Sequence, residues 1–230
     1  MKAVVLAGGL GTRLKGRVPN LPKPMAPVAG RPFLEYLLDR LAGAGVHEVI
    51  LSVGYRWQAI ADHFGEEYRG MRLRYAVEVE PLGTGGALAH ALNGEGDEPV
   101  LVLNGDTLLT VDYSELFFWF LAELAEVGMV LRRVPDAARY GSVVVRDGRV
   151  AEFLEKGCSG PGLINAGVYL LKPAIFSRLG LSGRFSLEVD LLQRHREELS
   201  PLAFITDAYF IDIGIPEDYD RAQRELQTLQ

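Results

Sequence analysis

The sequence predicts an α/β protein with a central, mostly parallel sheet that helices cover on both faces. Apolar, strand-like runs alternate with helical patterns through the first half of the chain, which is the order of elements found in parallel sheets. The run PVLVLNGD at residues 99–106 is almost wholly apolar before it ends in polar residues, as expected for a strand buried on both faces. A chain of 230 residues is long enough to bury a sizeable core in one domain.

The first half of the chain has recognisable element boundaries. Strands are expected at residues 2–6, 48–53, 72–78 and 99–106. Helices are expected around Leu34–Leu41, over 58–64, and over 87–92 after a glycine turn at 83–86. Ligands of open parallel sheets bind beyond the carboxyl ends of the strands. The polar residues that follow strands 2–6 and 99–106 are therefore expected on one rim.

The second half is richer in strands. Strands are expected within 128–134, 141–156, 162–172 and 208–214, with the Asp-Gly of RDGR as a hairpin turn. Helices are expected over 186–199 and 216–226, the second with Pro216 in its first turn. The sequence contains no repeat, low-complexity tract or linker. We therefore expect a single domain over residues 1–230, with halves of about 1–110 and 111–230.

Composition and charge exclude several classes of protein. The formal net charge of −6 argues against a protein that coats nucleic acid. The apolar runs all fall short of the roughly 18 residues that cross a bilayer, so no membrane association is expected. The single cysteine, Cys158, excludes an internal disulfide and a cysteine-rich metal site. A cytoplasmic location is the resulting expectation.

The charges near the N-terminus are unevenly distributed. No acidic residue precedes Glu35. The basic residues before it are Lys2, Arg13, Lys15, Arg17, Lys23 and Arg31. A positive patch on an acidic protein favours a small anionic ligand; the alternative is chance clustering on a solvated face.

The stretch LAGGLGTRL at residues 6–14 combines three glycines with Thr12 and Arg13. Glycines let a bound group approach the main chain, and consecutive N–H groups form an anion-binding concavity. Arg13 adds a bidentate positive charge suited to phosphate. A dinucleotide-binding turn fits poorly because Leu14 stands where its third glycine belongs, and no Gly-Lys-Ser/Thr of a P-loop follows. A phosphate-binding turn remains, with a purely structural turn as the alternative.

Six segments carry a family resemblance. LAGGLGTRL, LPKPMAPVAGRPFLEYLL, EPLGTGGAL, LVLNGD, EKG followed by INAGVY, and FIDIGIPEDYDRA occur in the order seen in sugar-1-phosphate nucleotidyltransferases. The chain resembles that family over essentially its whole length, and most closely its D-glycero-α-D-manno-heptose 1-phosphate guanylyltransferase branch. The resemblance implies a Rossmann-like nucleotidyltransferase fold with a mixed, mostly parallel sheet in three α/β/α layers. It also implies that the left-handed β-helix extension of larger relatives is missing.

The family reaction needs aligned charges more than a general base. A sugar 1-phosphate oxygen, already anionic, attacks the α-phosphorus of a nucleoside triphosphate and pyrophosphate leaves, so positioning and charge neutralisation dominate. Arg13 is expected on the triphosphate and the departing pyrophosphate, and Lys23 between its two prolines on phosphate near the reacting centre. Asp106 and Asp212, each among apolar residues near a strand end, are expected to hold Mg²⁺. The alternatives are a surface lysine and capping carboxylates, and sequence alone does not bring two distant carboxylates together.

The remaining candidate residues divide between the two substrates. Glu80 is expected to read guanine, whose adjacent N1–H and N2–H₂ donors suit one carboxylate, unless it caps a turn or faces water. The full nucleotide-binding set is Leu6, Ala7, Gly8, Gly9, Gly11, Thr12, Arg13, Glu80, Pro81, Gly83, Thr84 and Gly85. By resemblance, the first half of the chain binds GTP and the second half binds the sugar phosphate. The sugar-phosphate set is Gly105, Glu155, Lys156, Asn165 and Gly167.

Other functions and one structural question stay open. A uridylyl- or thymidylyltransferase acting on a hexose or amino-sugar 1-phosphate is the alternative enzyme, and a catalytically silent nucleotide-sugar sensor is the alternative of another class. The expected product would supply cell-surface glycan assembly. Apolar residues cover nearly the whole helix expected at 112–124, which fits either deep burial or a subunit contact in a homodimer.

Overall fold

A ten-stranded mixed sheet forms the centre of the computed structural model, which describes residues 1–9, 11, 14, 16–19, 21–157 and 159–227. The strand order is β10-β11-β13-β9-β12-β7-β1-β4-β6-β5. Four neighbouring strands run parallel: β7 (Val100–Asn104), β1 (Lys2–Leu6), β4 (Glu48–Val53) and β6 (Met71–Val77). These are the four strands expected in the first half of the chain: β1 and β4 have the expected bounds, and the ends of β6 and β7 differ by one or two residues.

The second half of the chain extends this sheet on the side of β7. The strand β12 (Gly162–Leu171) runs antiparallel to both β7 and β9 (Val127–Val134). The strand β13 (Leu202–Thr206) then pairs parallel with β9, and the hairpin of β10 (Ser142–Arg146) and β11 (Arg149–Leu154) follows. The hairpin turns at Asp147 and Gly148, both with positive φ, as the Asp-Gly pair predicts. At the other edge lies β5 (Glu67–Tyr68).

Helices cover both faces of the sheet, because successive strand residues point to opposite faces. Ala3 and Val5 belong to one apolar core, whereas Val4 belongs to the other. The first core is covered by α1 (Phe33–Gly43), α2 (Gln58–Phe64), α4 (Tyr113–Ala122) and α7 (Pro216–Glu225). The second is covered by α3 (Gly83–Ala91), α5 (Ala174–Arg178), the π-helical segment η3 (Leu187–Gln193) and α6 (Arg196–Leu199). The three-layer α/β class is therefore confirmed.

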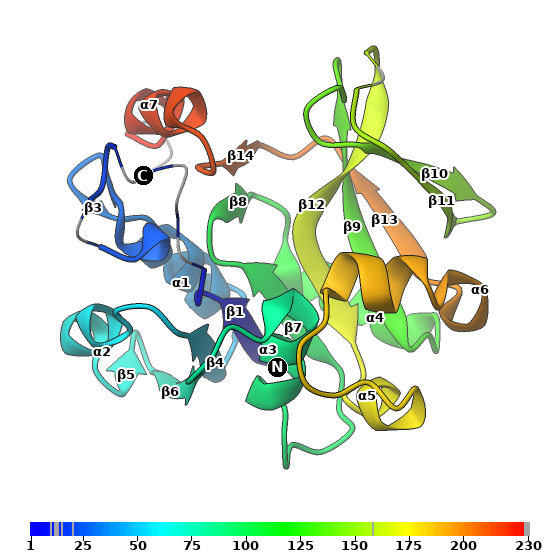
Figure 1. Ribbon diagram of the computed structural model, residues 1–230, viewed down its shortest axis with the longest axis horizontal. Coiled ribbons are helices and arrows are strands. Elements are labelled where there is room, and N and C mark those ends of the chain that lie inside the picture. The colour runs from blue at the N-terminus through cyan, green and yellow to red at the C-terminus, as the bar shows by residue number, and fades with distance from the viewer. Residues whose placement is uncertain (10, 12–13, 15, 20, 158, 228–230) are drawn as a thin grey trace.

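Three short elements lie outside the central sheet and carry residues of the candidate site. The single-turn helix η2 (Lys23–Met25) leads into the small hairpin of β2 (Pro27–Val28) and β3 (Arg31–Pro32). Beyond the end of β7, β8 (Thr107–Leu109) pairs antiparallel with β14 (Phe210–Asp212). Figure 1 shows these two strands side by side next to α7.

Several elements differ from the sequence-based expectation: the short elements η2, β2, β3, β5, β8 and α5 were not expected, and three larger differences have a physical reason. The helix α3 begins at Gly83 rather than at 87, because the segment around Phe185 packs directly on its glycines. The helix expected over 186–199 divides into η3 and α6, with the Ser186 hydroxyl capping the first turn through Val189 N–H at 3.1 Å. The strand β13 was not expected from the sequence, because its short apolar run lacks a clear period of its own.

The helix α4 is apolar on both its buried and its exposed sides. Tyr113, Leu116 and Phe120 are buried in the first core, whereas Phe118 and Leu124, just beyond the end of the helix, are exposed. A subunit contact over the exposed side stays a prediction. Among the helices that the structure describes, none combines the length and apolar character needed to span a bilayer.

Candidate functional site

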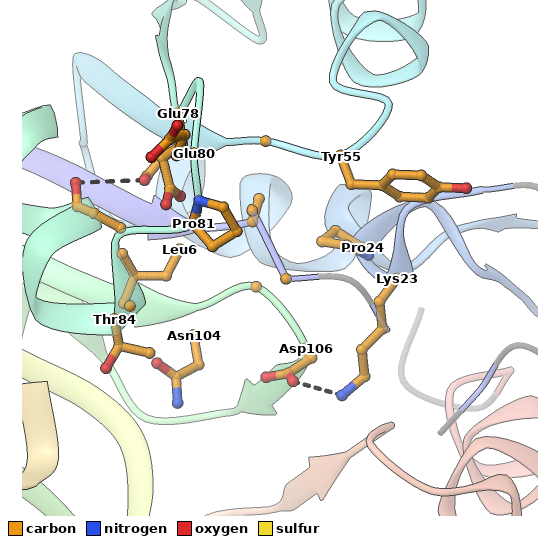
Figure 2. Close-up of a pocket in the computed structure, with 18 of the residues that line it drawn as sticks. Leu6, Lys23, Pro24, Tyr55, Glu78, Glu80, Pro81, Thr84, Asn104 and Asp106 are labelled. Atoms are coloured by element: carbon orange, nitrogen blue, oxygen red, sulfur yellow. Dashed lines mark hydrogen bonds and ion pairs between the residues drawn. The ribbon is translucent and has the colours of Figure 1, made fainter. Parts of the chain in front are cut away.

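A cavity of about 550 Å³ lies beyond the carboxyl ends of the parallel strands β1, β4 and β7. This is the rim on which open α/β sheets bind ligands. The residues predicted from the sequence that line it are Leu6, Ala7, Gly8, Gly9, Lys23, Glu80, Pro81, Gly83, Thr84, Gly105 and Asp106. Figure 2 shows Glu78 and Glu80 on one side of this cavity and Lys23 with Asp106 on the other.

The pairing of β8 with β14 brings together two carboxylates that are distant in the sequence. Asp212 lies opposite Thr107, the residue that follows Asp106, and the Ile213 N–H donates to the Asp106 carbonyl at 3.0 Å. Burial raises the pKa of Asp212, and the nearby negative charge of Asp106 raises it further, while Lys23 acts in the opposite direction. Two like charges are therefore held close enough to need a shared cation.

Lys23 supplies such a cation. Its Nζ lies 2.5 Å from Asp106 Oδ2 and 3.8 Å from Asp212 Oδ1, and Figure 2 shows the side chain reaching toward Asp106. The backbone at this position is restricted by Pro22 and Pro24 on either side and turns through η2. The segment thus fixes the Cα and Cβ of Lys23, and the position of the ammonium depends on the rotatable bonds of its side chain.

The glycine turn lies against both Lys23 and the neighbouring strand ends. A Cβ on Gly11, whose φ is +56°, would lie 3.1 Å from Lys23 Cβ. A Cβ on Gly8 would lie 2.5 Å from Glu78 Oε1. The glycines therefore allow close packing of the main chain at this rim. Arg13, the predicted triphosphate ligand, and Thr12, a member of the predicted nucleotide-binding set, lie outside the described residues.

The wall opposite Lys23 contains two carboxylates rather than one. Glu80, the predicted reader of the base, lines the cavity and is exposed. Glu78 also lines it, and its Oε2 accepts a hydrogen bond from the Leu82 N–H at 3.0 Å. The sequence reasoning did not identify Glu78, although it belongs to the same EVE triplet. Tyr55 and Asn104, at the ends of β4 and β7, are further lining residues that it did not identify.

The glycines of GTGG serve packing as well as lining. Gly83 lines the cavity with φ of +71°, and a Cβ on it would lie 2.6 Å from the Phe185 carbonyl oxygen. Gly85 is buried, and a Cβ there would overlap the Phe185 ring. Gly105 behaves similarly, since a Cβ on it would lie 2.7 Å from the Leu6 carbonyl oxygen. A direct ligand contact at Gly85 or Gly105 stays a prediction.

A hydrogen-bond network that runs from exposed Thr84 to buried Tyr169 connects the two halves of the chain beside the cavity. Glu188 Oε2 accepts from Thr84 Oγ1 at 2.9 Å, and Glu188 Oε1 accepts from the Tyr169 hydroxyl at 3.2 Å. Asn165 Nδ2 donates to the same hydroxyl at 2.6 Å, and its Oδ1 accepts from the Gly167 N–H at 3.0 Å. Burial and the charge of Glu188 raise the pKa of Tyr169 well above its usual value. The sequence reasoning did not place Glu188 in the site.

The other predicted sugar-phosphate residues lie farther from the cavity. Asn165 and Gly167 are behind its wall, where a Cβ on Gly167 would lie 2.8 Å from Asn104 Nδ2. Glu155 and Lys156 follow β11 and are exposed. Neither is among the described residues that line the cavity. Their contact with a sugar phosphate stays a prediction.

The fold, and a strand-end rim that combines glycines and Lys23 with carboxylates, are those of a nucleotidyltransferase. The model of the nucleotidyl transferase family matches residues 2–228, and the chain belongs to that family, whose members typically use a divalent metal. The family resemblance of the sequence is therefore confirmed.

Within the family, the chain is similar to proteins named as guanylyltransferases and to a structure complexed with GMP-PN. The chain is 46% identical over 227 residues to the D-glycero-α-D-manno-heptose 1-phosphate guanylyltransferase of Aneurinibacillus thermoaerophilus, covering 99% of both chains. It is 43% identical over 220 residues to the enzyme of the same name from Campylobacter jejuni, covering 95% of this chain and 97% of that one. A crystal structure of HddC from Yersinia pseudotuberculosis complexed with GMP-PN is 38% identical, with a TM-score of 0.84 over 98% of this chain and 99% of that chain.

Proposed function

We propose that this protein transfers GMP from GTP to D-glycero-α-D-manno-heptose 1-phosphate and releases pyrophosphate. The similarity to two heptose 1-phosphate guanylyltransferases over nearly the full length of all three chains carries this proposal. The similar HddC structure, which is complexed with GMP-PN, supports guanine as the base. The product is a nucleotide-sugar suited to cell-surface glycan assembly.

The nucleotide occupies the cavity in this proposal. Its triphosphate lies over the glycine turn, where Gly8 and Gly9 line the cavity and where Arg13 contributes its guanidinium. Its base faces the wall that contains Glu80, and a carboxylate there accepts from both N1–H and N2–H₂ of guanine. The lining glutamate Glu78 already accepts a hydrogen bond from the Leu82 N–H, whereas Glu80 accepts none from the described residues, so Glu80 is the proposed reader of the base.

The Asp106–Asp212 pair fits a divalent metal. Magnesium is bound in proteins by one or two carboxylates together with substrate phosphates, and the pair offers two half-buried carboxylates that already face a cation, the ammonium of Lys23. Among the described residues, no cluster of three or more His, Cys, Asp or Glu side chains suggests a competing site. When bound, Mg²⁺ neutralises charge on the phosphates as the transfer proceeds.

The chain's own residues then act mainly by alignment. The attacking oxygen of the sugar 1-phosphate forms a bond to the α-phosphorus, the bond from that phosphorus to the bridging oxygen breaks, and pyrophosphate leaves with the electron pair. No proton has to be removed from the nucleophile. Lys23 and Arg13 neutralise the phosphates, and Gly105, Glu155, Lys156, Asn165 and Gly167 form the proposed sugar-phosphate side.

A matrix of substrates tests the proposal. Purified protein is incubated with Mg²⁺, each of GTP, UTP, dTTP and ATP, and a panel of sugar 1-phosphates that includes the manno-heptose, mannose and glucose compounds. Release of pyrophosphate is expected to be fastest for GTP with the manno-heptose phosphate. A preference for UTP or dTTP with a hexose phosphate would overturn the base and sugar assignment. Nucleotide binding without any turnover would identify a sensor instead.

A further inference from the structure

Lys23 occupies the position between the two carboxylates that the proposed function assigns to a metal. Its Nζ lies 2.5 Å from Asp106 Oδ2 and 3.8 Å from Asp212 Oδ1. Only 14% of the Lys23 side chain is exposed, so the carboxylates rather than water are the main partners of the ammonium. The lysine is therefore a counter-ion inside the site and not a solvated surface charge.

The local backbone is shaped to admit this ammonium. A Cβ on Gly214 would lie 3.1 Å from Lys23 Nζ and 2.8 Å from Asp212 Oδ1, so a side chain at this position would crowd both charged groups. The Gly214 N–H also donates to Asp212 Oδ1 at 2.7 Å, which orients that carboxylate toward the lysine. The space between the carboxylates is thus limited and already contains one cation.

A metal ion and the ammonium cannot share these oxygens in the observed arrangement. Magnesium binds oxygen at about 2.0–2.1 Å, and Lys23 Nζ already donates to Asp106 Oδ2 at an N···O distance of 2.5 Å. Two cations this close to one oxygen repel each other strongly at a partly buried position. Metal binding through these two oxygens, Asp106 Oδ2 and Asp212 Oδ1, therefore requires Lys23 to move.

The base of the Lys23 side chain lies beside Gly11 of the glycine turn. The Lys23 Cβ packs at the position of Gly11, where a methyl group would approach it to 3.1 Å. Because the stem is flexible, rotation about this point would move the ammonium away from the carboxylates, while the flanking prolines keep the backbone in place. The same side chain can thus serve the carboxylates in one state and a phosphate in the other.

We propose that Lys23 is an internal substitute for the metal: its ammonium holds Asp106 and Asp212 together in the metal-free protein, and a divalent cation has to displace it. The displaced lysine becomes available to the nucleotide phosphate, which is the part that rests on the proposed function. The competition itself depends only on the three side chains. Metal loading and delivery of the lysine to phosphate are therefore coupled steps.

Direct metal titration without nucleotide tests the competition. Mn²⁺, which prefers the same oxygen ligands, is titrated into the protein while free Mn²⁺ is followed by electron paramagnetic resonance. Lys23→Met retains the apolar stem and removes the charge, so it is expected to bind Mn²⁺ about tenfold or more tightly than the wild type. Adding Asp106→Asn to Lys23→Met is expected to abolish the gain. Equal or weaker binding by Lys23→Met would overturn the proposal.

A matched charge control separates displacement from a general field effect. Arg17 lies on the same N-terminal segment, but its guanidinium pairs with Asp220 at 2.8 Å on α7 and is about half exposed. Arg17→Met also removes one positive charge and is expected to bind Mn²⁺ within about twofold of the wild type, because exposed charges are screened by solvent and salt. An equal gain in both variants would show that Lys23 acts only through its field and would overturn the proposal.

Two further measurements keep the test decisive. Mg²⁺ is expected to raise the melting temperature of Lys23→Met more than that of the wild type, because a ligand that binds the folded state more tightly stabilises it more. If Lys23→Met does not fold, Lys23→Gln replaces it in the Mn²⁺ titration and in the melting experiment. Pyrophosphate release by the wild type is measured in parallel. Tighter Mn²⁺ binding without any guanylyltransferase activity would refute the proposed function and leave the competition standing, whereas activity without tighter binding would do the opposite.

Discussion

Gly105 is the position at which a single methyl group is expected to disturb the site most directly. Its N–H donates to the Leu6 carbonyl at 2.9 Å, and a Cβ on Gly105 would lie 2.7 Å from that same oxygen. The oxygen belongs to the backbone at the end of a central strand and cannot rotate away. Since such carbon–oxygen contacts relax at about 3.3 Å, Gly105→Ala requires the ends of β1 and β7 to separate by roughly 0.6 Å.

The size of the expected effect follows from this displacement. Overpacking of a buried position costs about 1–3 kcal/mol, which lowers the melting temperature of a chain of this size by roughly 2–12 °C. The same displacement moves the adjacent Asp106. Because a 1 Å misplacement of a reacting group can cost about 100-fold in rate, kcat is expected to fall roughly 10- to 100-fold.

Calorimetry and pyrophosphate release measure these two effects, and Gly43→Ala is the control. A Cβ on Gly43, the last residue of α1, would have no neighbour within 4 Å among the described atoms, so that variant is expected to match or slightly exceed the wild-type melting temperature. If Gly105→Ala retained the melting temperature and kcat of the wild type, the strand ends would have more room than the distances indicate and the steric reasoning would be wrong.

Three further outcomes are expected. Hydrogen bonds from Lys2, which has the larger effect, and from Arg74 hold the pKa of Glu95 below its usual value. Because the pKa of Glu95 is lower in the folded than in the unfolded state, these pairs stabilise the protein at a pH above the unfolded-state pKa. That stabilisation is lost as the pH falls through the folded-state pKa. Arg74→Met should therefore lower the urea midpoint at neutral pH by more than at acid pH. Tyr169→Phe should raise KM for the sugar phosphate about threefold to tenfold with KM for GTP within about twofold, and equal increases in both would indicate a purely structural hydroxyl. Glu80→Gln should reduce the ratio of kcat/KM for GTP to that for UTP about tenfold, and an unchanged ratio would transfer the role to Glu78.

The regular elements of this protein were predictable because their patterns are local. Apolar runs such as residues 2–6 and 99–106 fixed the parallel strands to within one or two residues. The start of α3 was not predictable in this way. Gly83 has a positive φ and reads as a turn, and only its contact with Phe185 explains why helix begins there. That contact joins segments about 100 residues apart, which a local pattern cannot contain.

The candidate site was predictable in its residue types but not in its arrangement. The motifs identified Lys23, Asp106 and Asp212 individually. The meeting of the two carboxylates depends on β8 and β14, a two-stranded sheet with three residue pairs. Strands this short lack a pattern that specifies their partner. Glu188 illustrates the same limit, since its role in linking Thr84 to Tyr169 depends on distances between separate elements.

Helix α7 provides the mechanical link between the lysine and the second carboxylate. It begins at Pro216, four residues after Asp212, and its Tyr219 hydroxyl donates to the Pro27 carbonyl at 2.5 Å, four residues after Lys23. The nearly buried Asp218 in its first turn pairs with Arg139 and with Arg221. The helix therefore fixes the backbone positions of both segments. Since these roots are fixed, the exchange proposed between Lys23 and a metal requires movement of side chains only, and the carboxylate pair can persist in both states.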